Sequence, residues 1–181
     1  MKMVEACTST NDLLYSFKIS CLAPRMRKVP RYVEWISPSS GVLKFNVDCS
    51  AIGKLGPTGI GGVLRDCNAK VKGLFSVKIG VADSNYAELR AVLEALVVYD
   101  AQSEIRGSSL IIESDSYNCV SWVNGDEVCC WKYANTLNQI HNLIRKIGGV
   151  SITKIFREAN KFADNLAKQG VYRYEDFRAM F

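Results

Sequence analysis

Three segments in the first half of the chain alternate apolar and polar residues, a pattern typical of half-buried strands. They are residues 42–48, 59–64 and 71–79. Only a short turn, Asp66-Cys67-Asn68, separates the second segment from the third. Strands that follow one another this closely pair most simply with their neighbours, so we predict a three-stranded antiparallel meander.

After Ser84 the apolar spacing changes to that of a helix, with Ser84 or Asn85 as its N-cap. The rest of the chain alternates strands and helices. The predicted elements are a buried strand at 110–112, a helix through 120–123, a helix at 131–147, a strand at 150–156 and a helix capped by Asn160. The last two strands must therefore arrive by crossovers, and we predict an α/β fold with a five-stranded mixed sheet flanked by helices.

Domain boundaries follow from the same pattern. Residues 1–36 contain prolines and a basic run and predict a flexible basic lead-in, in which the basic run is a solvated linker rather than a nuclear signal or nucleic-acid clamp. Residues 37–170 form the predicted domain, and residues 171–181 a C-terminal tail.

The amino-acid composition limits the classes of protein and the kinds of metal or catalytic site that this chain can form. With 48% hydrophobic and 23% charged residues the chain can bury a core, and no segment is long and apolar enough for a membrane span. Seven cysteines without a CxxC pair and a single histidine, His141, disfavour a disulfide framework and a histidine metal site, so oxygen ligands must carry any chemistry. We expect an intracellular protein, nuclear or cytoplasmic, with no membrane association and no obligate protein partner. The net charge of +5 excludes only a histone-like polycation.

Four acidic residues fall where predicted strands and helices begin or end. They are Asp48, Glu88, Asp115 and Asp164. Any one of them alone would be interpreted as a helix cap or a partner of the helix dipole. Together they predict a site, because ligands of such sheets bind near the carboxyl ends of the strands.

Five motifs around these acids resemble, in order and spacing, the ribonuclease H type 1 family, and most closely its plant branch of non-LTR retroelement domains. The resemblance covers about Trp35 to Gly170. The motifs are 45–50 (FNVDCS), 59–66 (GIGGVLRD), 85–89 (NYAEL), 112–116 (IESDS) and 157–168 (REANKFADNLAK).

The resemblance implies a ribonuclease H-like fold and an endonuclease that hydrolyses the RNA strand of RNA/DNA hybrids, leaving 5′-phosphates. It places Asp48, Glu88, Asp115 and Asp164 as catalytic ligands of two Mg²⁺ ions, for which Mn²⁺ could substitute. Mg²⁺ prefers such hard oxygen ligands, and two ions about 3.5 to 4 Å apart can promote an in-line phosphoryl displacement.

The resemblance also suggests substrate contacts. Gly59 and Gly61 would let backbone groups approach an RNA 2′-hydroxyl, although simple strand packing explains them equally well. Asn85 would contact the minor groove of the hybrid or cap its helix. Asn160 is also predicted to contact the substrate. Lys154 stands where many relatives carry a loop histidine and would hold a phosphate, with an exposed strand lysine as the alternative.

Departures from the family weaken this picture. Cys49 replaces a usual glycine, and Asp83 stands where relatives carry a Ser or Thr that helps to hold a DNA phosphate. The basic handle of some bacterial relatives is absent, so Trp122, Trp131 and Tyr133 are expected to pack within the domain. We therefore expect weak substrate affinity. Two alternatives stay open: a retroelement-derived nucleic-acid-binding module of the same fold that cleaves weakly or not at all and, with less support, an exonuclease or resolvase.

Overall fold

The computed structural model describes residues 33–53, 56–103, 105 and 107–181, so most of the predicted lead-in lies outside the described residues. One compact unit extends from Tyr32 to Phe181. Its strands are β1 (Val42–Ala51), β2 (Gly56–Arg65), β3 (Val71–Ala82), β4 (Ser109–Ser114), β5 (Val150–Lys154) and β6 (Phe177–Met180). Its α-helices are α2 (Ser84–Asp100), α3 (Tyr117–Asn124), α4 (Ala134–Ile147) and α5 (Lys161–Tyr172), and its short 3-10 helices are η1 (Trp131–Tyr133) and η2 (Arg157–Ala159).

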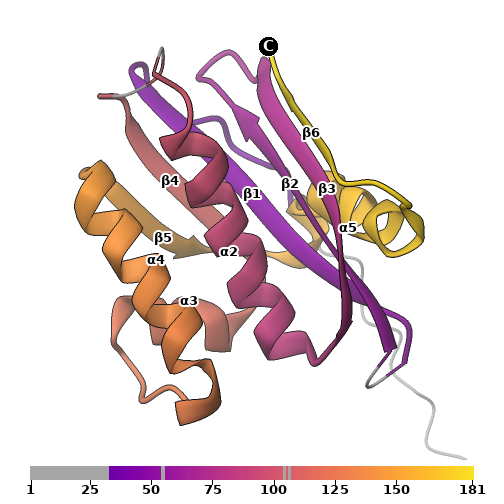
Figure 1. The fold of residues 1–181 in the computed structure, drawn as a ribbon. Coiled ribbons are helices and arrows are strands. Elements are labelled where there is room, and N and C mark those ends of the chain that lie inside the picture. Colours follow the sequence, from indigo (N-terminus) through magenta and orange to yellow (C-terminus); the bar gives the residue numbers. More distant parts are fainter. Residues whose placement is uncertain (1–32, 54–55, 104, 106) are drawn as a thin grey trace, which may run out of the picture. The chain divides into compact units, whose positions relative to one another are not determined.

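The strands form one mixed sheet in the order β5-β4-β1-β2-β3-β6 (Figure 1). β1, β2 and β3 are the predicted antiparallel meander, and β4 and β5 continue the sheet in parallel with β1. The prediction of an α/β sheet with two crossover strands is confirmed.

The predicted number of strands is wrong by one. Residues 177–180 lie in the predicted C-terminal tail, yet they pair antiparallel with β3, with Ser76 opposite Phe177 and Gly73 opposite Met180. Four residues carry too little alternation to identify a strand, and this pairing depends on the free edge of β3.

Two sets of helices cover the sheet from opposite sides. The core forms where Phe45 and Val47 of β1 pack with apolar residues of α2, such as Leu89 and Leu96. Figure 1 shows α2 lying across this face, with α4 beside it and α5 behind the sheet. Asp83, rather than the predicted Ser84 or Asn85, caps α2, because its carboxylate accepts a hydrogen bond from the backbone N–H of Tyr86 at 3.0 Å.

Two glycines of β2 allow α5 to lie close to the sheet. A Cβ atom on Gly61 would lie 2.3 Å from the backbone nitrogen of Ala167, and one on Gly59 would lie 2.3 Å from that of Val171. Such distances are far below van der Waals contact, so a side chain at either position would displace the helix. Both glycines are buried under α5, and the structure thus supports the packing alternative over the predicted substrate contact.

No helix within the described part of the chain is long and apolar enough to cross a membrane.

Candidate active site

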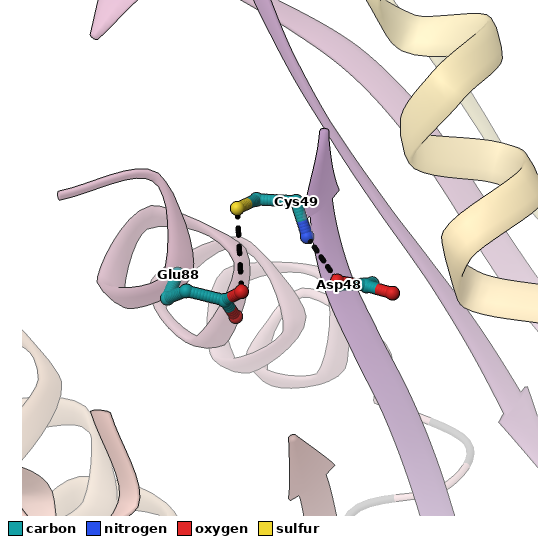
Figure 2. Close-up of side chains that lie close together, drawn as sticks. All are labelled: Asp48, Cys49 and Glu88. Atoms are coloured by element: carbon teal, nitrogen blue, oxygen red, sulfur yellow. Dashed lines mark hydrogen bonds between the residues drawn. The ribbon is translucent and has the colours of Figure 1, made fainter. Parts of the chain in front are cut away.

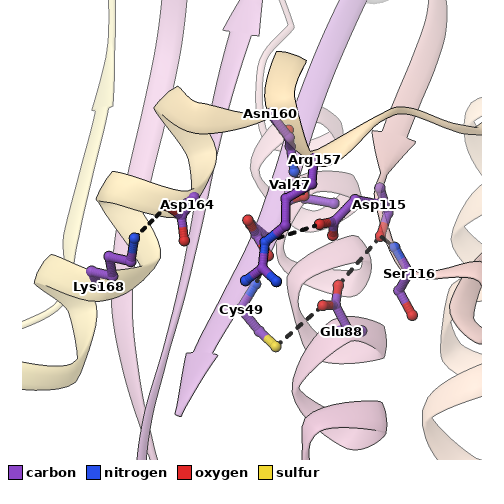
Figure 3. A network of polar contacts seen from close by, with 11 residues as sticks. Val47, Cys49, Glu88, Asp115, Ser116, Arg157, Asn160, Asp164 and Lys168 are labelled. Carbon is purple, nitrogen blue, oxygen red and sulfur yellow. Dashed lines mark hydrogen bonds and ion pairs between the residues drawn. The ribbon is translucent and has the colours of Figure 1, made fainter. Parts of the chain in front are cut away.

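Four structural elements bring the predicted acids to one end of the sheet (Figure 3). Asp48 lies on β1 and Asp115 directly follows β4, while Glu88 is the fifth residue of α2 and Asp164 lies in the first turn of α5. β1 and β4 are parallel neighbours whose last paired residues are Val47 and Ser114. Asp48 and Asp115 are the next residues beyond this pairing, so they lie near each other where the parallel ladder ends, as expected for ligand sites in such sheets.

Asp48 is the most deeply buried of the four acids, with 2% of its surface exposed. Its Oδ1 atom accepts a hydrogen bond from the backbone N–H of Cys49 at 2.8 Å, whereas its Oδ2 atom is buried and has no hydrogen-bond partner. Burial, reinforced by the charge of Asp115, raises the pKa of Asp48 to about 7. An unpaired buried carboxylate oxygen is costly, and a bound cation would remove that cost.

Glu88 is also buried and is held by two donors. Its Oε1 atom accepts a hydrogen bond from the Cys49 thiol at 3.3 Å, and its Oε2 atom accepts one from the Ser114 hydroxyl at 3.3 Å. Burial and then the charge of Asp48 raise the pKa of Glu88 to about 8. These contacts fix the orientation of the carboxylate toward the end of β1.

Cys49, where the family usually has glycine, takes part in this arrangement (Figure 2). One ligand atom from each of Asp48, Cys49 and Glu88 lies within 4.8 Å of the other two. Burial raises the pKa of the Cys49 thiol, and the neighbouring charge of Glu88 adds to this effect. The thiol therefore stays protonated and donates its hydrogen to Glu88.

Arg157 lies beside the acids, although the sequence analysis did not select it. Its Nε atom is 3.8 Å from Oδ2 of Asp115, and 76% of its side chain is exposed. Burial raises the pKa of Asp115, and the charge of Arg157 opposes that rise. The signal that could have identified Arg157 is its place in the 157–168 motif, three residues before Asn160.

Asp164 faces the other acids from the first turn of α5 (Figure 3). Its charge contributes to the raised pKa values of Asp48 and Asp115, which shows that it lies within electrostatic range of both. Lys168, one turn later, pairs with it at 2.5 Å. The structure thus brings all four predicted acids within electrostatic range of one another at one site.

Asn160, predicted to contact substrate and to cap the last helix, makes a structural contact; its contact with substrate stays a prediction. It is 1% exposed, and its Nδ2 atom donates a hydrogen bond to the backbone oxygen of Val47 at 2.9 Å. Asn160 does occupy the predicted N-cap position of α5, but its side chain makes no cap bond to the helix. The side chain instead fastens the start of α5 to β1 directly beside Asp48.

Asn85 and Lys154 lie at the rim of the site. Asn85 is half-buried at the start of α2, where its Oδ1 atom accepts a hydrogen bond from Asn118 at 3.3 Å. Lys154 is exposed at the end of β5, directly opposite Ser114 in the ladder, and its ammonium group lies 5.2 Å from the Tyr117 ring centroid. Contact of either residue with a substrate stays a prediction.

Asp83 joins the start of α2 to the aromatic residues in and after α3. The carboxylate of Asp83 accepts a 2.6 Å hydrogen bond from the Tyr133 hydroxyl and pairs with Lys132 at 3.5 Å, which joins the start of α2 to η1. Trp122 and Tyr133 pack on each other as expected, with ring centroids 5.5 Å apart. The same expectation is wrong for Trp131, which is 86% exposed.

The donor set suits a hard divalent cation. The carboxylates of Asp48, Glu88, Asp115 and Asp164 offer several oxygen atoms in a small, partly buried space, and one of these atoms is a buried oxygen without a partner. Oxygen-rich sites of this kind suit Mg²⁺ and Mn²⁺.

Comparison with known proteins agrees with the fold. Residues 46–170 match the family described as "Reverse transcriptase-like". An Arabidopsis thaliana protein named "Putative ribonuclease H protein" is 34% identical over 140 residues, which are 77% of this chain but only 22% of that protein. The chain thus spans about a fifth of the length of this relative.

Solved structures agree on the fold. RNase H1 from Halobacterium salinarum has a TM-score of 0.65 and 23% identity, over 72% of this chain and 97% of the other. LC11-RNase H1 in complex with an RNA/DNA hybrid has a TM-score of 0.67 and 23% identity, over 71% of this chain and 96% of the other. The chain belongs to the reverse transcriptase-like family of ribonuclease H-fold proteins, as its motifs led us to expect.

Proposed function

We propose that this chain is a metal-dependent ribonuclease H that hydrolyses the RNA strand of RNA/DNA hybrids. The observation that carries the proposal is the convergence of four carboxylates where the parallel pairing of β1 and β4 ends, with a buried, unpartnered oxygen on Asp48. Support also comes from the relative named as a ribonuclease H and from the fold shared with an RNase H1 crystallised with an RNA/DNA hybrid.

The proposed cofactor is Mg²⁺, with two ions held by Asp48, Glu88, Asp115 and Asp164. Bound there, they would supply the activation of an attacking water and the stabilisation of the leaving 3′ oxygen. The chain supplies orientation: Ser114 holds Oε2 of the Glu88 carboxylate, and Asn160 fastens α5 beside Asp48. Arg157 and Lys154 offer cationic groups at the rim, where a phosphate of the hybrid backbone could bind.

A second candidate is a nucleic-acid-binding module of retroelement origin that cleaves weakly or not at all. One observation favours it: the Cys49 thiol occupies Oε1 of Glu88, an atom that the metal site would use. A thiol is a poor ligand for Mg²⁺, so Cys49 adds no suitable metal ligand, and its hydrogen bond to Glu88 competes with metal binding.

A cleavage assay on an end-labelled RNA/DNA hybrid separates the two candidates. The full chain is incubated with Mg²⁺, with Mn²⁺ or with EDTA, and duplex DNA and duplex RNA serve as substrate controls. We expect metal-dependent cuts in the RNA strand only, and equal cutting of duplex DNA would contradict the requirement for ribonucleotides.

Variants connect that activity to the site. Asp48→Asn and Asp115→Asn should each abolish cleavage, whereas Asp126→Asn, an exposed acid after α3, should not. Because removing one of several clustered like charges relieves repulsion, neither site variant should melt at a lower temperature than the parent in EDTA. Hybrid binding without cleavage in the parent protein would favour the second candidate.

A further inference from the structure

A second cluster of polar side chains lies on the same face of β1 as Asp48, toward the start of the strand. Successive side chains alternate between the two faces, so Lys44 and Asn46 share the face of Asp48. We name this group the Glu113 cluster. It consists of Trp35, Lys44, Asn46, Arg65 and Glu113.

Glu113 of β4 lies at the centre of the cluster. Its Oε2 atom accepts hydrogen bonds from Asn46 Nδ2 at 2.7 Å and from Trp35 Nε1 at 3.2 Å. Its Oε1 atom pairs with the Lys44 ammonium group at 2.9 Å. The Glu113 side chain is only 13% exposed and Asn46 is fully buried, so these bonds lie largely out of water, where they are strong.

The orientation of the Asn46 amide is fixed from its other side. Arg65 Nη2 donates to Asn46 Oδ1 at 2.7 Å, and the Arg65 guanidinium lies 3.5 Å from the centroid of the Trp35 ring. Because a guanidinium has donors only, the Asn46 oxygen must face Arg65 and its nitrogen must face Glu113. The segment before β1 covers this arrangement: Trp35 stacks on Arg65, and the backbone oxygen of Ile36 accepts a bond from Lys44 at 2.8 Å.

The cluster adjoins the candidate metal ligands through the sheet register. Asn46 lies directly opposite Glu113 in the parallel β1 and β4 ladder. Asp48 is two residues beyond Asn46, and Asp115 is two residues beyond Glu113. The ladder ends at Val47 and Ser114, so the bond between Asn46 and Glu113 is the last side-chain link between the strands on this face before the two acids.

We propose that Asn46 and Glu113 are positioning residues that set the separation of Asp48 and Asp115 and thereby the affinity of the site for divalent metal ions. The proposal rests on the proposed function, since it concerns the same site. Two carboxylates at the ends of adjacent strands repel each other, which tends to separate the strand ends. The buried hydrogen bond between Asn46 and Glu113, two residues before the acids on each strand, opposes that separation and keeps the acids close enough to share metal ions.

Metal binding by the full chain without nucleic acid tests this role, because it needs no catalytic turnover. Mn²⁺ is titrated into the parent protein, Asn46→Ala, Glu113→Ala and the double variant, by calorimetry and by the shift in melting temperature. We expect each single variant to raise the half-saturating Mn²⁺ concentration about tenfold, the order found for residues that orient metal ligands. The double variant should add little to either single variant, because both remove the same bond.

Tyr99→Phe is the matched control. The Tyr99 hydroxyl is another polar group in the core and donates to the backbone oxygens of Ile105 at 3.0 Å and Ser108 at 2.7 Å, just before the opposite end of β4. Its removal should lower the melting temperature and leave the half-saturating Mn²⁺ concentration unchanged. If Glu113→Ala does not fold, Glu113→Gln keeps the shape and one acceptor, and it should show a smaller shift in the same direction.

Two outcomes would overturn the proposal, and they differ. If the parent binds Mn²⁺ and the cluster variants melt earlier but keep the half-saturating concentration within about twofold of the parent, the cluster only stabilises the fold. If the parent itself binds no Mn²⁺, the proposed function fails together with this inference.

Discussion

The guanidinium of Arg157 lies 3.8 Å from the carboxylate of Asp115, so a cation of the chain itself stands beside a candidate metal ligand. The Arg157 side chain is largely exposed and extends from the short helix η2, so it can turn away once another cation neutralises Asp115. A guanidinium released at this position would face a bound nucleic acid, and its paired donors suit a phosphate.

Replacing Arg157 with alanine should therefore weaken binding of the hybrid without weakening binding of metal. We expect KM for hybrid cleavage to rise about tenfold, and the dependence of affinity on salt to become less steep, because one phosphate contact is lost. The half-saturating Mg²⁺ concentration should stay the same or fall, since the competing cation is gone. Steady-state kinetics at several salt concentrations measure both effects.

Arg157→Lys and Arg145→Ala complete that experiment. Lysine keeps the charge but not the paired donors and should recover part of the affinity. Arg145 is an exposed arginine on α4, bonded to Asn142 of the same helix, and its loss should change nothing. An unchanged KM in Arg157→Ala would show that the residue serves only as a partner of Asp115.

Stability in the absence of metal should depend on pH in an unusual direction. Burial and mutual repulsion raise the pKa of Asp48 to about 7 and that of Glu88 to about 8. Near neutral pH the folded protein therefore binds protons at Asp48 and Glu88 that the unfolded chain does not bind. This proton binding stabilises the fold, and the stabilisation is lost as the pH rises through the two folded-state pKa values. In EDTA, the melting temperature should rise as the pH is lowered from about 9 to about 6.

Asp48→Asn is the control for this pH dependence. Asparagine cannot ionise, so the variant should show a smaller rise in melting temperature over the same range. Saturating Mg²⁺ should also flatten the parent curve, because the metal neutralises the carboxylates in place of protons. If the melting temperature in EDTA stays constant or falls as the pH is lowered from about 9 to about 6, the raised pKa values are contradicted.

The sequence predicts the central part of this fold because local patterns encode it. Strand alternation places Asp48 on a strand, and the change to helical spacing places Glu88 near the start of a helix, so the elements that hold these two acids follow from periodicity alone. The convergence of four acids then follows from the order of the motifs. The strands and helices predicted from these local patterns form in the structure because the local preferences agree with the tertiary packing.

Other features depend on contacts between distant segments, which no local pattern reports. Gly61 is needed because α5 lies on it, and Asn160 is buried because it reaches across to β1. Trp131 has the composition of a core residue but lies exposed after α3. Arg157 begins the short helix η2, which has no periodicity that identifies it, and its ion pair with Asp115 is seen only in three dimensions.

The sixth strand should contribute measurably to stability. Arg178 of β6 forms an ion pair with Glu94 of α2, whose side chain is almost completely buried, while Arg178 is 44% exposed. Removing one partner of a fully buried pair costs roughly 3–5 kcal/mol, and the exposure of Arg178 reduces that cost. We expect Arg178→Met to lower the free energy of unfolding by about 2 kcal/mol in urea denaturation, because it leaves Glu94 buried without its partner.

The double variant Glu94→Leu with Arg178→Met distinguishes the ion pair from general packing. It removes the buried charge together with its partner, so it should recover much of the lost stability. Lys78→Met, on the exposed side of β3, is the matched control and should be nearly neutral. If the single Arg178 variant is as stable as the parent, β6 contributes little to the domain.

Lys154 offers a test of proton transfer at the rim. Lys154 lies at the end of β5, directly opposite Ser114, the residue that precedes Asp115. Burial raises the pKa of Asp115, and the charge of Lys154 opposes that rise. A lysine, with an ordinary pKa of roughly 10.4, stays protonated at neutral pH and can hold a phosphate but cannot accept a proton there. A histidine, with an ordinary pKa of roughly 6.5, can do both.

We therefore expect Lys154→His to raise turnover of the hybrid several-fold near pH 7 while the metal dependence stays the same. Lys154→Ala should instead raise KM and reduce the salt dependence of binding, because only a phosphate contact is lost. Lys78→His, on β3, controls for the added imidazole and should leave turnover unchanged. Single-turnover and steady-state rates separate these effects. If the histidine variant is no faster, and the alanine variant matches the parent at low salt, then Lys154 is an exposed strand residue without a part in the reaction.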